Sequence, residues 1–388
     1  NRMKKALTVL LALCLIASLT ACGGSKKTDT ESSEPIVIGC LQDITGKTSS
    51  LGKMVTAGVQ WAADEINANG GIDGRQVEIK VYDTTGSVDE AVTAFTTAVT
   101  VDKVSVIVGP PVANIALAIA PISENYDVPV LGFALDKSCQ VKEDGTAYKN
   151  MFLFQPNSDQ QAAIMATYAV KEAGVKTFGI IYNEQNSYST SLVAGFENTV
   201  ANLSGASITK KVAYTADNKD FKTLLQSLMD ADAIFAPNYT ADLALITQAA
   251  SELNYKGKLV CGLDACPPFN TIVENVDDLS NVIYINNVDD TEESMAKLIK
   301  EVKEKDGIDA TNKFFLGYDV MNILAKTIKE VGTDSVAIRD AVEKLSGYEG
   351  LTGTITINPK THMPEGLEMV MFTYDGKTPV MLKRYSAD

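Results

Sequence analysis

The segment from Val104 to Asp136 constrains the fold most strongly, because it reads in succession as strand, loop, helix and strand. Its first run, VSVIVG, is rich in β-branched residues and ends at Gly109, which is typical of a buried parallel strand. Two prolines then stop the strand, and isoleucines recur at helical spacing. In an open α/β sheet, ligands bind beyond the carboxyl ends of the strands. Residues 110–114 and 132–136 are therefore predicted to border a binding site.

Strand-like and helix-like runs alternate along two consecutive stretches of the chain. In the first, strands predicted over 35–41 and 76–82 flank an amphipathic helix over 53–67. The second begins with a helix over 159–172 and a strand over 177–182. Such alternation is typical of a parallel sheet covered by helices. We therefore predict an α/β fold with two doubly wound parallel-sheet lobes.

The last part of the chain is predicted to add helices and a hairpin. Helical patterns cover 292–305, 315–331 and 336–345. The runs 367–372 and 380–384 are predicted to pair as a closing hairpin. Trp61 in the first helix is expected to pack in the core.

The N-terminus has the pattern of a targeting segment. Three basic residues precede a mostly apolar run over 6–19, which is too short to span a membrane comfortably. The following LTAC-GG resembles a bacterial lipoprotein lipobox, in which Cys22 carries the lipid. We therefore predict a lipoprotein signal peptide over 1–21 and a flexible tether over 22–34. An ordinary signal peptide with a chance cysteine is the alternative.

The charge of the chain excludes some partners. Removal of the three basic residues of the signal takes the formal net charge from −15 to −18. So acidic a protein is not expected to bind nucleic acid or an anionic membrane face electrostatically. The lipid would hold it to the membrane instead.

Cysteine and histidine usage excludes a zinc site. Beyond the signal and the lipidation site, the chain has Cys40, Cys139, Cys261 and Cys266, and its one histidine is His362. No paired-ligand spacing for zinc occurs. The cysteines at 261 and 266 could form a disulfide outside the cytosol, or all four could be free buried thiols. His362, in a turn-like stretch, is expected at the surface.

Motifs of common α/β enzymes are missing from the chain. The sequence has no G-x-S-x-G elbow, no G-x-x-x-x-G-K-[ST] loop and no G-x-G-x-x-G fingerprint. A single histidine also leaves no good catalytic triad. We therefore expect a binding protein with no cofactor and not an enzyme.

Several phrases carry a family resemblance that extends over residues 36–385: ITGKTSSLG, DEINANGGIDGRQVEIKVYD, VIVGPPVANIALAIAPISENYDVPVL, DFKTLLQSLMDADAIFAPNY and FLGYDVMNIL. With them the chain resembles the branched-chain amino acid (Leu/Ile/Val) class of ABC-transporter substrate-binding proteins, which have the type I periplasmic-binding-protein fold.

The resemblance implies two lobes joined by three crossovers, with a ligand in the cleft between them. The first lobe would comprise 35–155 plus 289–347, and the second 156–288 plus 348–388. The lobes would close on the ligand by a hinge motion. The protein would be a monomeric receptor that delivers a small polar solute to the membrane permease of an ABC importer. A sensory ligand-binding protein is an alternative.

The resemblance also implies a ligand site. In relatives that bind amino acids, hydroxyl and backbone N–H groups of the first lobe hold the α-carboxylate, and an acid with a tyrosine from the second lobe holds the α-ammonium. Each charge of a buried zwitterion thereby finds a partner. The matching positions in this chain are Ser50, Leu51, Val112, Ala113, Asn114, Ala134, Asp136, Tyr188, Asn238, Tyr239 and Asp264.

The first lobe departs from that pattern at two loops. Val112-Ala113-Asn114 stands where amino-acid binders have a serine-rich loop, and Ala134-Leu135-Asp136 stands where they have a threonine. If Asp136 faces the ligand, it would repel a carboxylate, and the ligand would be an amine, amide or base. Alternatively, Asp136 caps a turn or pairs with Lys137. Branched-chain amino acids are the first candidates. Asp319 is expected to have a role in the fold.

Overall fold

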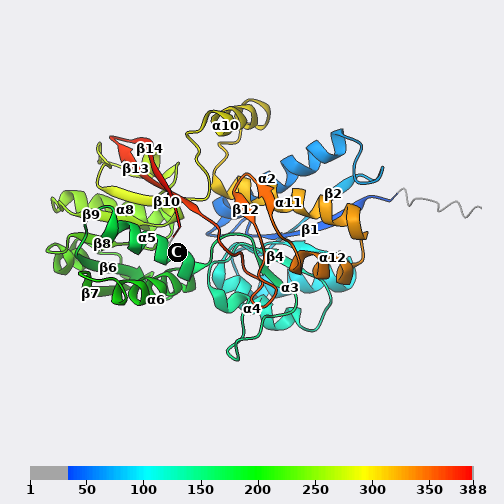
Figure 1. Cartoon of the computed structure of the whole chain (residues 1–388), viewed down its shortest axis with the longest axis horizontal. Coiled ribbons are helices and arrows are strands. Elements are labelled where there is room, and N and C mark those ends of the chain that lie inside the picture. The colour runs from blue at the N-terminus through cyan, green and yellow to red at the C-terminus, as the bar shows by residue number, and fades with distance from the viewer. Residues whose placement is uncertain (1–33, 387–388) are drawn as a thin grey trace, which may run out of the picture. The chain divides into compact units, whose positions relative to one another are not determined.

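The computed structural model describes residues 34–386, and its compact unit begins at Pro35. The predicted signal peptide, Cys22 and nearly all of the predicted tether lie outside the described residues. The unit holds two large sheets, each covered by helices on both faces (Figure 1). We call each sheet with its helices a lobe.

The first sheet is parallel, and its five strands lie in the order β2-β1-β3-β4-β5. The strands are β1 (Ile36–Gln42), β2 (Val77–Asp83), β3 (Ile107–Val108), β4 (Val130–Gly132) and β5 (Met151–Leu153). The helix α2 (Ser49–Ala68) packs on one face, and α3 (Val88–Thr96) and α4 (Ala113–Ser123) pack on the other. Strand order reverses between β1 and β3, where open α/β sheets bind ligands.

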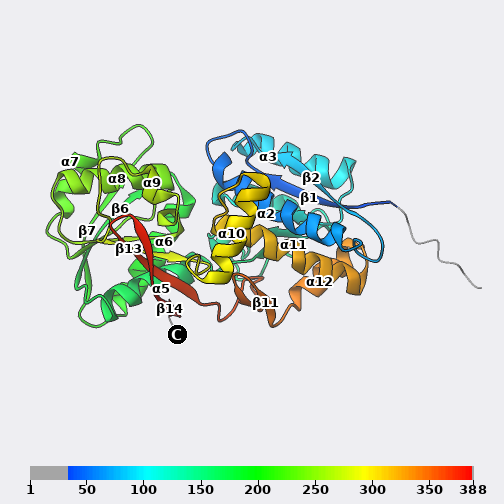
Figure 2. The ribbon, with the colours of Figure 1, turned by 90° about the horizontal axis from the view of Figure 1, so that it is seen from above.

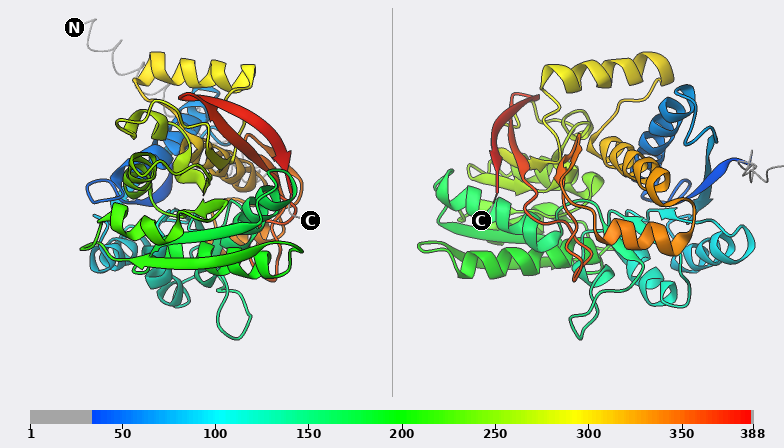
Figure 3. Two further views of the ribbon diagram at one scale, coloured as in Figure 1. Left: turned by 90° about the vertical axis from the view of Figure 1, so that its left-hand side faces the viewer. Right: turned by 45° about the vertical axis from the view of Figure 1, so that its right-hand side comes forward.

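The second sheet repeats this order and adds a hairpin. Its order is β14-β13-β10-β9-β8-β6-β7. The parallel strands are β6 (Thr177–Asn183), β7 (Ser207–Tyr214), β8 (Ala233–Phe235), β9 (Lys258–Cys261) and β10 (Val282–Asn286). The predicted closing hairpin is confirmed as β13 (Met369–Asp375) and β14 (Thr378–Tyr385), which are antiparallel (red in Figure 3).

Helices cover both faces of the second sheet. One face carries α5 (Ser158–Lys171) and α6 (Ser187–Ala201). The other carries α7 (Phe221–Leu225), α8 (Thr240–Glu252) and α9 (Phe269–Ile272). The two lobes of the predicted fold are therefore present.

The chain returns to the first lobe after β10. It forms α10 (Glu293–Asp306), α11 (Asn312–Val331) and α12 (Ser335–Glu343), and α11 lies against α2 (Figure 2). The two helices approach closely at Gly58 and Gly317, where a Cβ atom would clash with the opposite backbone. Trp61 packs edge-on against Phe314 at 6.2 Å between ring centroids, which confirms its predicted core position.

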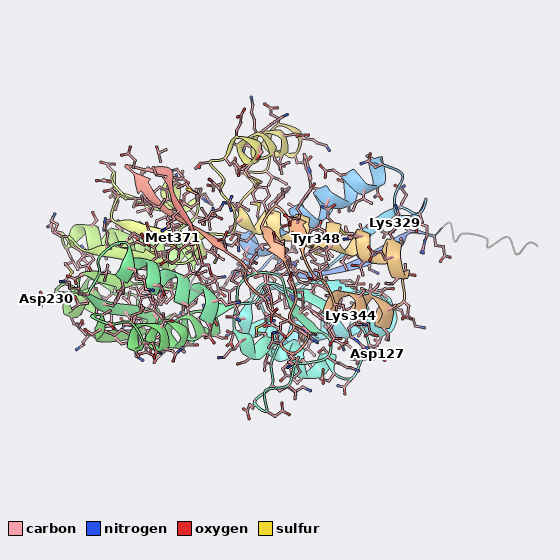
Figure 4. All side chains as sticks on the ribbon, in the orientation of Figure 1. Asp127, Asp230, Lys329, Lys344, Tyr348 and Met371 are labelled. Carbon is pink, nitrogen blue, oxygen red and sulfur yellow. The ribbon has the colours of Figure 1, made fainter. Side chains whose placement is uncertain are left out.

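A small strand pair, β11 (Tyr348–Gly350) and β12 (Gly353–Ile355), follows α12. Asp319 of α11 accepts hydrogen bonds from the backbone N–H groups of Leu351 (2.9 Å) and Thr352 (2.8 Å), which confirms its role in the fold. Tyr348, labelled in Figure 4, and Ile355 pack in the core of the first lobe. The predicted lobe boundary at residue 347 stays a prediction. Because Tyr348 and Ile355 still pack on the first lobe, the packing favours a return of the chain to the second lobe after residue 355.

The expectation that His362 lies at the surface is wrong. Its side chain is buried and stacks on Phe152 at 4.2 Å, and its backbone carbonyl accepts a hydrogen bond from the N–H of Leu153. The turn-like stretch lies along β5, which a local pattern does not reveal. Cys40, Cys139, Cys261 and Cys266 are all free and buried, so no disulfide joins the last two.

Two features are absent from residues 34–386. None of their helices has the length and apolar character needed to cross a membrane. Nor do they contain a group of three or more histidine, cysteine or acidic side chains able to hold a metal ion.

Candidate functional site

Loops at the carboxyl ends of the strands of both sheets meet at a cavity of about 230 Å³, which we call the outer cavity. The first lobe contributes the loop after β1, the start of α2 and the start of α11, and the second lobe contributes the loops after β8 and β9. Its lining residues are Lys47, Thr48, Ser50, Leu51, Met54, Tyr239, Thr240, Ala241, Leu263, Asp264, Cys266, Pro267, Pro268, Ile272, Thr311, Asn312 and Lys313.

A narrower space of about 30 Å³, which we call the inner cavity, shares five of these residues and extends toward the loops after β3, β4 and β6. Its lining residues are Leu51, Pro111, Ala113, Phe133, Leu135, Gln155, Tyr188, Tyr239, Leu263, Asp264 and Lys313. Both lobes therefore form its walls.

Two tyrosines of the second lobe form an aromatic wall. Tyr188, at the start of α6, and Tyr239, after β8, stack with ring centroids 4.8 Å apart and planes 8° apart. Burial, together with the nearby charge of Asp264, raises the pKa of both phenols, so both stay neutral. The Oη atom of Tyr188 is buried and makes no hydrogen bond within the described residues. A buried polar group of this kind is able to bond to a ligand.

Asp264 supplies a buried carboxylate beside this wall. Its Oδ1 accepts hydrogen bonds from the backbone N–H (3.1 Å) and the hydroxyl (2.9 Å) of Thr240, the first residue of α8. The side chain is thereby fixed at a helix N-terminus, where a negative charge is favourable. Both of these bonds go to Oδ1.

The first-lobe wall mixes apolar and polar residues, and Thr48, Ser50 and Thr311 bring hydroxyl groups to it. Of the residues predicted there, Ser50, Leu51 and Ala113 line a cavity. Val112 and Ala134 do not, and Ala134 packs in a buried apolar cluster with residues of the second lobe. The loop at 112–114 therefore brings no hydroxyl group to the cavities, and the hydroxyl groups of this wall come from the loop after β1 and the residues next to α11.

Asp136 lies outside both cavities and makes polar contacts instead. Its Oδ1 caps a short turn by accepting from the N–H of Ser138 at 2.9 Å, and its Oδ2 accepts from the Ser187 hydroxyl at 2.7 Å. Asn114 is also at this boundary between the lobes, where its Oδ1 accepts from the N–H of Ser187 at 3.1 Å. Of the two alternatives for Asp136, these contacts favour the turn cap.

Asn238 also lies outside the cavities. Its Nδ2 donates to the carbonyl of Ile181 at 2.9 Å, and its Oδ1 accepts from the Tyr214 hydroxyl at 2.9 Å. These buried bonds tie the loop after β8 to β6 and β7, so Asn238 supports the loop that carries Tyr239.

Lys313 is a cavity residue that the sequence predictions missed. It is the second residue of α11, is half-buried and borders both cavities. A lysine in the first turn of a helix is unfavourable beside the positive end of the helix dipole. This unfavourable position was the one feature of the sequence that could have pointed to Lys313. The preceding Asn312 is buried and donates from Nδ2 to Asn287 at the end of β10 (3.2 Å), which anchors the start of α11 near a crossover.

Comparison with known proteins is consistent with this geometry. The Leu/Ile/Val-binding protein BraC3 of Rhizobium johnstonii is 24% identical over 83% of this chain and 87% of its own length. LivJ of Streptococcus pneumoniae, solved with isoleucine, superposes with a TM-score of 0.81 at 22% identity over 91% of this chain and 99% of its own.

A Rhodopseudomonas palustris solute-binding protein in complex with benzoate superposes with a TM-score of 0.78 at 16% identity, covering 91% of this chain and 96% of its own. These structures share the fold, and their printed ligands differ in chemistry. The family model for periplasmic binding proteins matches residues 35–378. The chain belongs to the periplasmic binding protein family.

Proposed function

We propose that this protein is the extracytoplasmic receptor of an ABC importer, which captures a small polar solute between its lobes and delivers it to a membrane permease. The observation that carries the proposal is the pair of adjoining cavities, whose walls come from both lobes. A ligand that contacts both walls stabilises the closed arrangement of the lobes, which is what hinge closure requires. The receptor binds its solute and releases it unchanged.

We propose an amino acid as the ligand, with branched-chain amino acids as the first candidates. The buried carboxylate of Asp264 and the neutral hydroxyls of Tyr188 and Tyr239 suit an ammonium group. Leu51 and Leu263 provide apolar surface beside them. The volume of the cavities suits a molecule of amino-acid size rather than a larger one.

An amine, amide or base is the second candidate, because position 113 in the first-lobe wall is alanine and the loop at 112–114 carries no hydroxyl group. Such a ligand would keep the contacts to Asp264 and would not need a hydroxyl clamp for a carboxylate.

Binding should be tested by isothermal titration calorimetry on protein that has been unfolded, dialysed and refolded to remove carried ligand. The panel contains the twenty amino acids together with matched amines and amides. Saturable binding of one chemical class, with the compound recovered unchanged, supports a receptor. Conversion of the bound compound contradicts it.

We also propose that a lipid on Cys22 holds the receptor at the outer face of the cell membrane. Replacement Cys22→Ser should release the protein from the membrane fraction, because one lipid signal is removed. Retention of the Cys22→Ser protein in the membrane fraction would contradict lipid anchoring without affecting the ligand site.

A further inference from the structure

The half-buried Lys313 borders both cavities without a partner for its charge among the described residues. Within residues 34–386, the Nζ atom of Lys313 makes no hydrogen bond and no ion pair, although the side chain is half-buried. By contrast, Lys137 and Lys142, which lie on the same lobe, pair with Asp159 and Glu124. A partly desolvated cation without a counter-charge is costly, so its position requires another explanation.

Local structure does not supply that explanation. Lys313 lies in the first turn of α11, where the helix dipole disfavours a cation. The Thr311 side chain makes no capping hydrogen bond at this end. The same dipole favours an anion, to which the ammonium group of Lys313 can donate a charge-assisted hydrogen bond.

The charge opposite Lys313 makes the site selective. Asp264 of the second lobe borders the same two cavities, and the two side chains do not form an ion pair with each other. A ligand with one cationic and one anionic end satisfies both. A simple amine would leave Lys313 without a counter-charge, and a simple carboxylate would leave Asp264 without one.

We infer that Lys313 binds an anionic group of the ligand, so that the ligand is a small zwitterion held between Lys313 and Asp264. The inference rests on the proposed receptor function and deepens it. A lysine and a helix N-terminus then perform the task for which the loop at 112–114 lacks hydroxyl groups. This inference excludes an amine, amide or base, the second candidate class of ligand, because such a ligand has no anionic group.

The test compares ligands and variants together by calorimetry. The probes are L-leucine, L-leucinamide, which lacks the carboxylate, and 4-methylpentanoate, which lacks the ammonium group. If another of the twenty amino acids binds best, its amide and its deaminated acid are used in the same way. The wild-type protein should bind the amino acid at least about tenfold more tightly than either analogue, because each analogue lacks one charge.

Variants assign that preference to Lys313. Lys313→Met should weaken amino-acid binding by about 10- to 100-fold and should bind the amino acid and its amide with equal affinity. Lys313→Arg should retain the preference for the amino acid over its amide. Lys329→Met is the matched control, because it removes the same charge from the other end of α11, about 24 Å along the helix, at the position labelled in Figure 4. It should bind like the wild type.

The outcomes separate this inference from the proposed function. The role of Lys313 is overturned if the wild-type protein binds the amino acid and its amide equally, or if folded Lys313→Met binds the amino acid as tightly as the wild type. Either result leaves the proposed receptor function unaffected. Failure of folded wild-type protein to bind any compound of the amino acid, amine and amide panel overturns the receptor proposal itself. If Lys313→Met does not fold, the role of Lys313 is still decided by two measurements: the affinities of wild-type protein for the amino acid and its amide, and the same comparison on Lys313→Arg.

Discussion

The Ser187 hydroxyl donates a 2.7 Å hydrogen bond to Oδ2 of Asp136, and this bond joins the first turn of α6 in the second lobe to the loop after β4 in the first. The N–H of Ser187 also donates to Asn114, and Lys137 pairs with Asp159 across the same boundary. We call Asn114, Asp136 and Ser187 the interlobe latch. It closes the boundary beside the cavities without lining them.

Ser187→Ala should weaken ligand affinity by about two- to tenfold, because a part-buried hydrogen bond to a charged group contributes about 1 kcal/mol to the closed arrangement. The preference among ligands should not change, since the latch does not line either cavity. Calorimetry with the whole panel measures both quantities. Ser207→Ala, on an exposed serine of the same lobe, is the control. A changed order of ligand preference would place the latch in the ligand site.

Asp264→Asn should weaken binding of ammonium-bearing ligands by at least about tenfold, because the amide keeps an oxygen acceptor for Thr240 but loses the charge. Calorimetry at neutral pH measures the loss. The exposed Asp277→Asn carries the same change on the same lobe and should bind as the wild type. Undiminished affinity of the Asp264→Asn protein would exclude a direct contact with the ligand cation.

Asp290 should make stability depend on pH. Burial, assisted by Asp289, raises the pKa of Asp290 to about 6, and its Oδ1 has no hydrogen-bond partner among the described residues. The folded state therefore binds the proton more tightly than the unfolded state, so this group's destabilising effect is full above pH 6 and disappears as pH falls toward 4. Asp290→Asn should raise the free energy of unfolding at pH 8 by on the order of 2 kcal/mol.

Thermal unfolding of both proteins between pH 4 and pH 8 checks this expectation. The difference in melting temperature should shrink as the pH is lowered. A difference that is constant with pH would mean that the ionisation of Asp290 is not its cause. Asp289→Asn serves as the comparison, since it removes only the neighbouring charge that contributes to the raised pKa.

His362 should have the opposite pH dependence. Burial lowers its pKa although Glu343 opposes the change, so the folded state holds the neutral ring and loses stability as pH falls below the ordinary pKa of about 6.5. His362→Gln should lower stability at pH 7, because the stacking on Phe152 is lost. It should also flatten the stability profile between pH 7 and pH 5.

Urea unfolding at several pH values in this range measures the slope directly. Glu343→Gln is a useful companion variant, since removal of the opposing charge should steepen the loss of stability in acid. A wild-type profile as flat as that of His362→Gln would show that the ring does not titrate in this range.

Local sequence patterns predicted most of the elements and part of the site. The two series of strands and helices follow from hydrophobic periodicity. Tyr188, Tyr239 and Asp264 were predicted as site residues from the family resemblance, and the structure places all three beside one cavity. The pattern around Asp319 likewise indicated a role in the fold.

Only the tertiary structure decided the roles of residues whose partners lie far along the chain. Ser187 meets Asp136 across 51 positions, and His362 stacks on a strand some two hundred residues earlier. Lys313 enters the site because α11 returns to the first lobe and packs on α2. The sequence by itself determined the elements, since these depend on neighbouring residues. The contacts between elements depend on long-range packing, and therefore the latch and the charge opposite Asp264 emerged only from the folded chain.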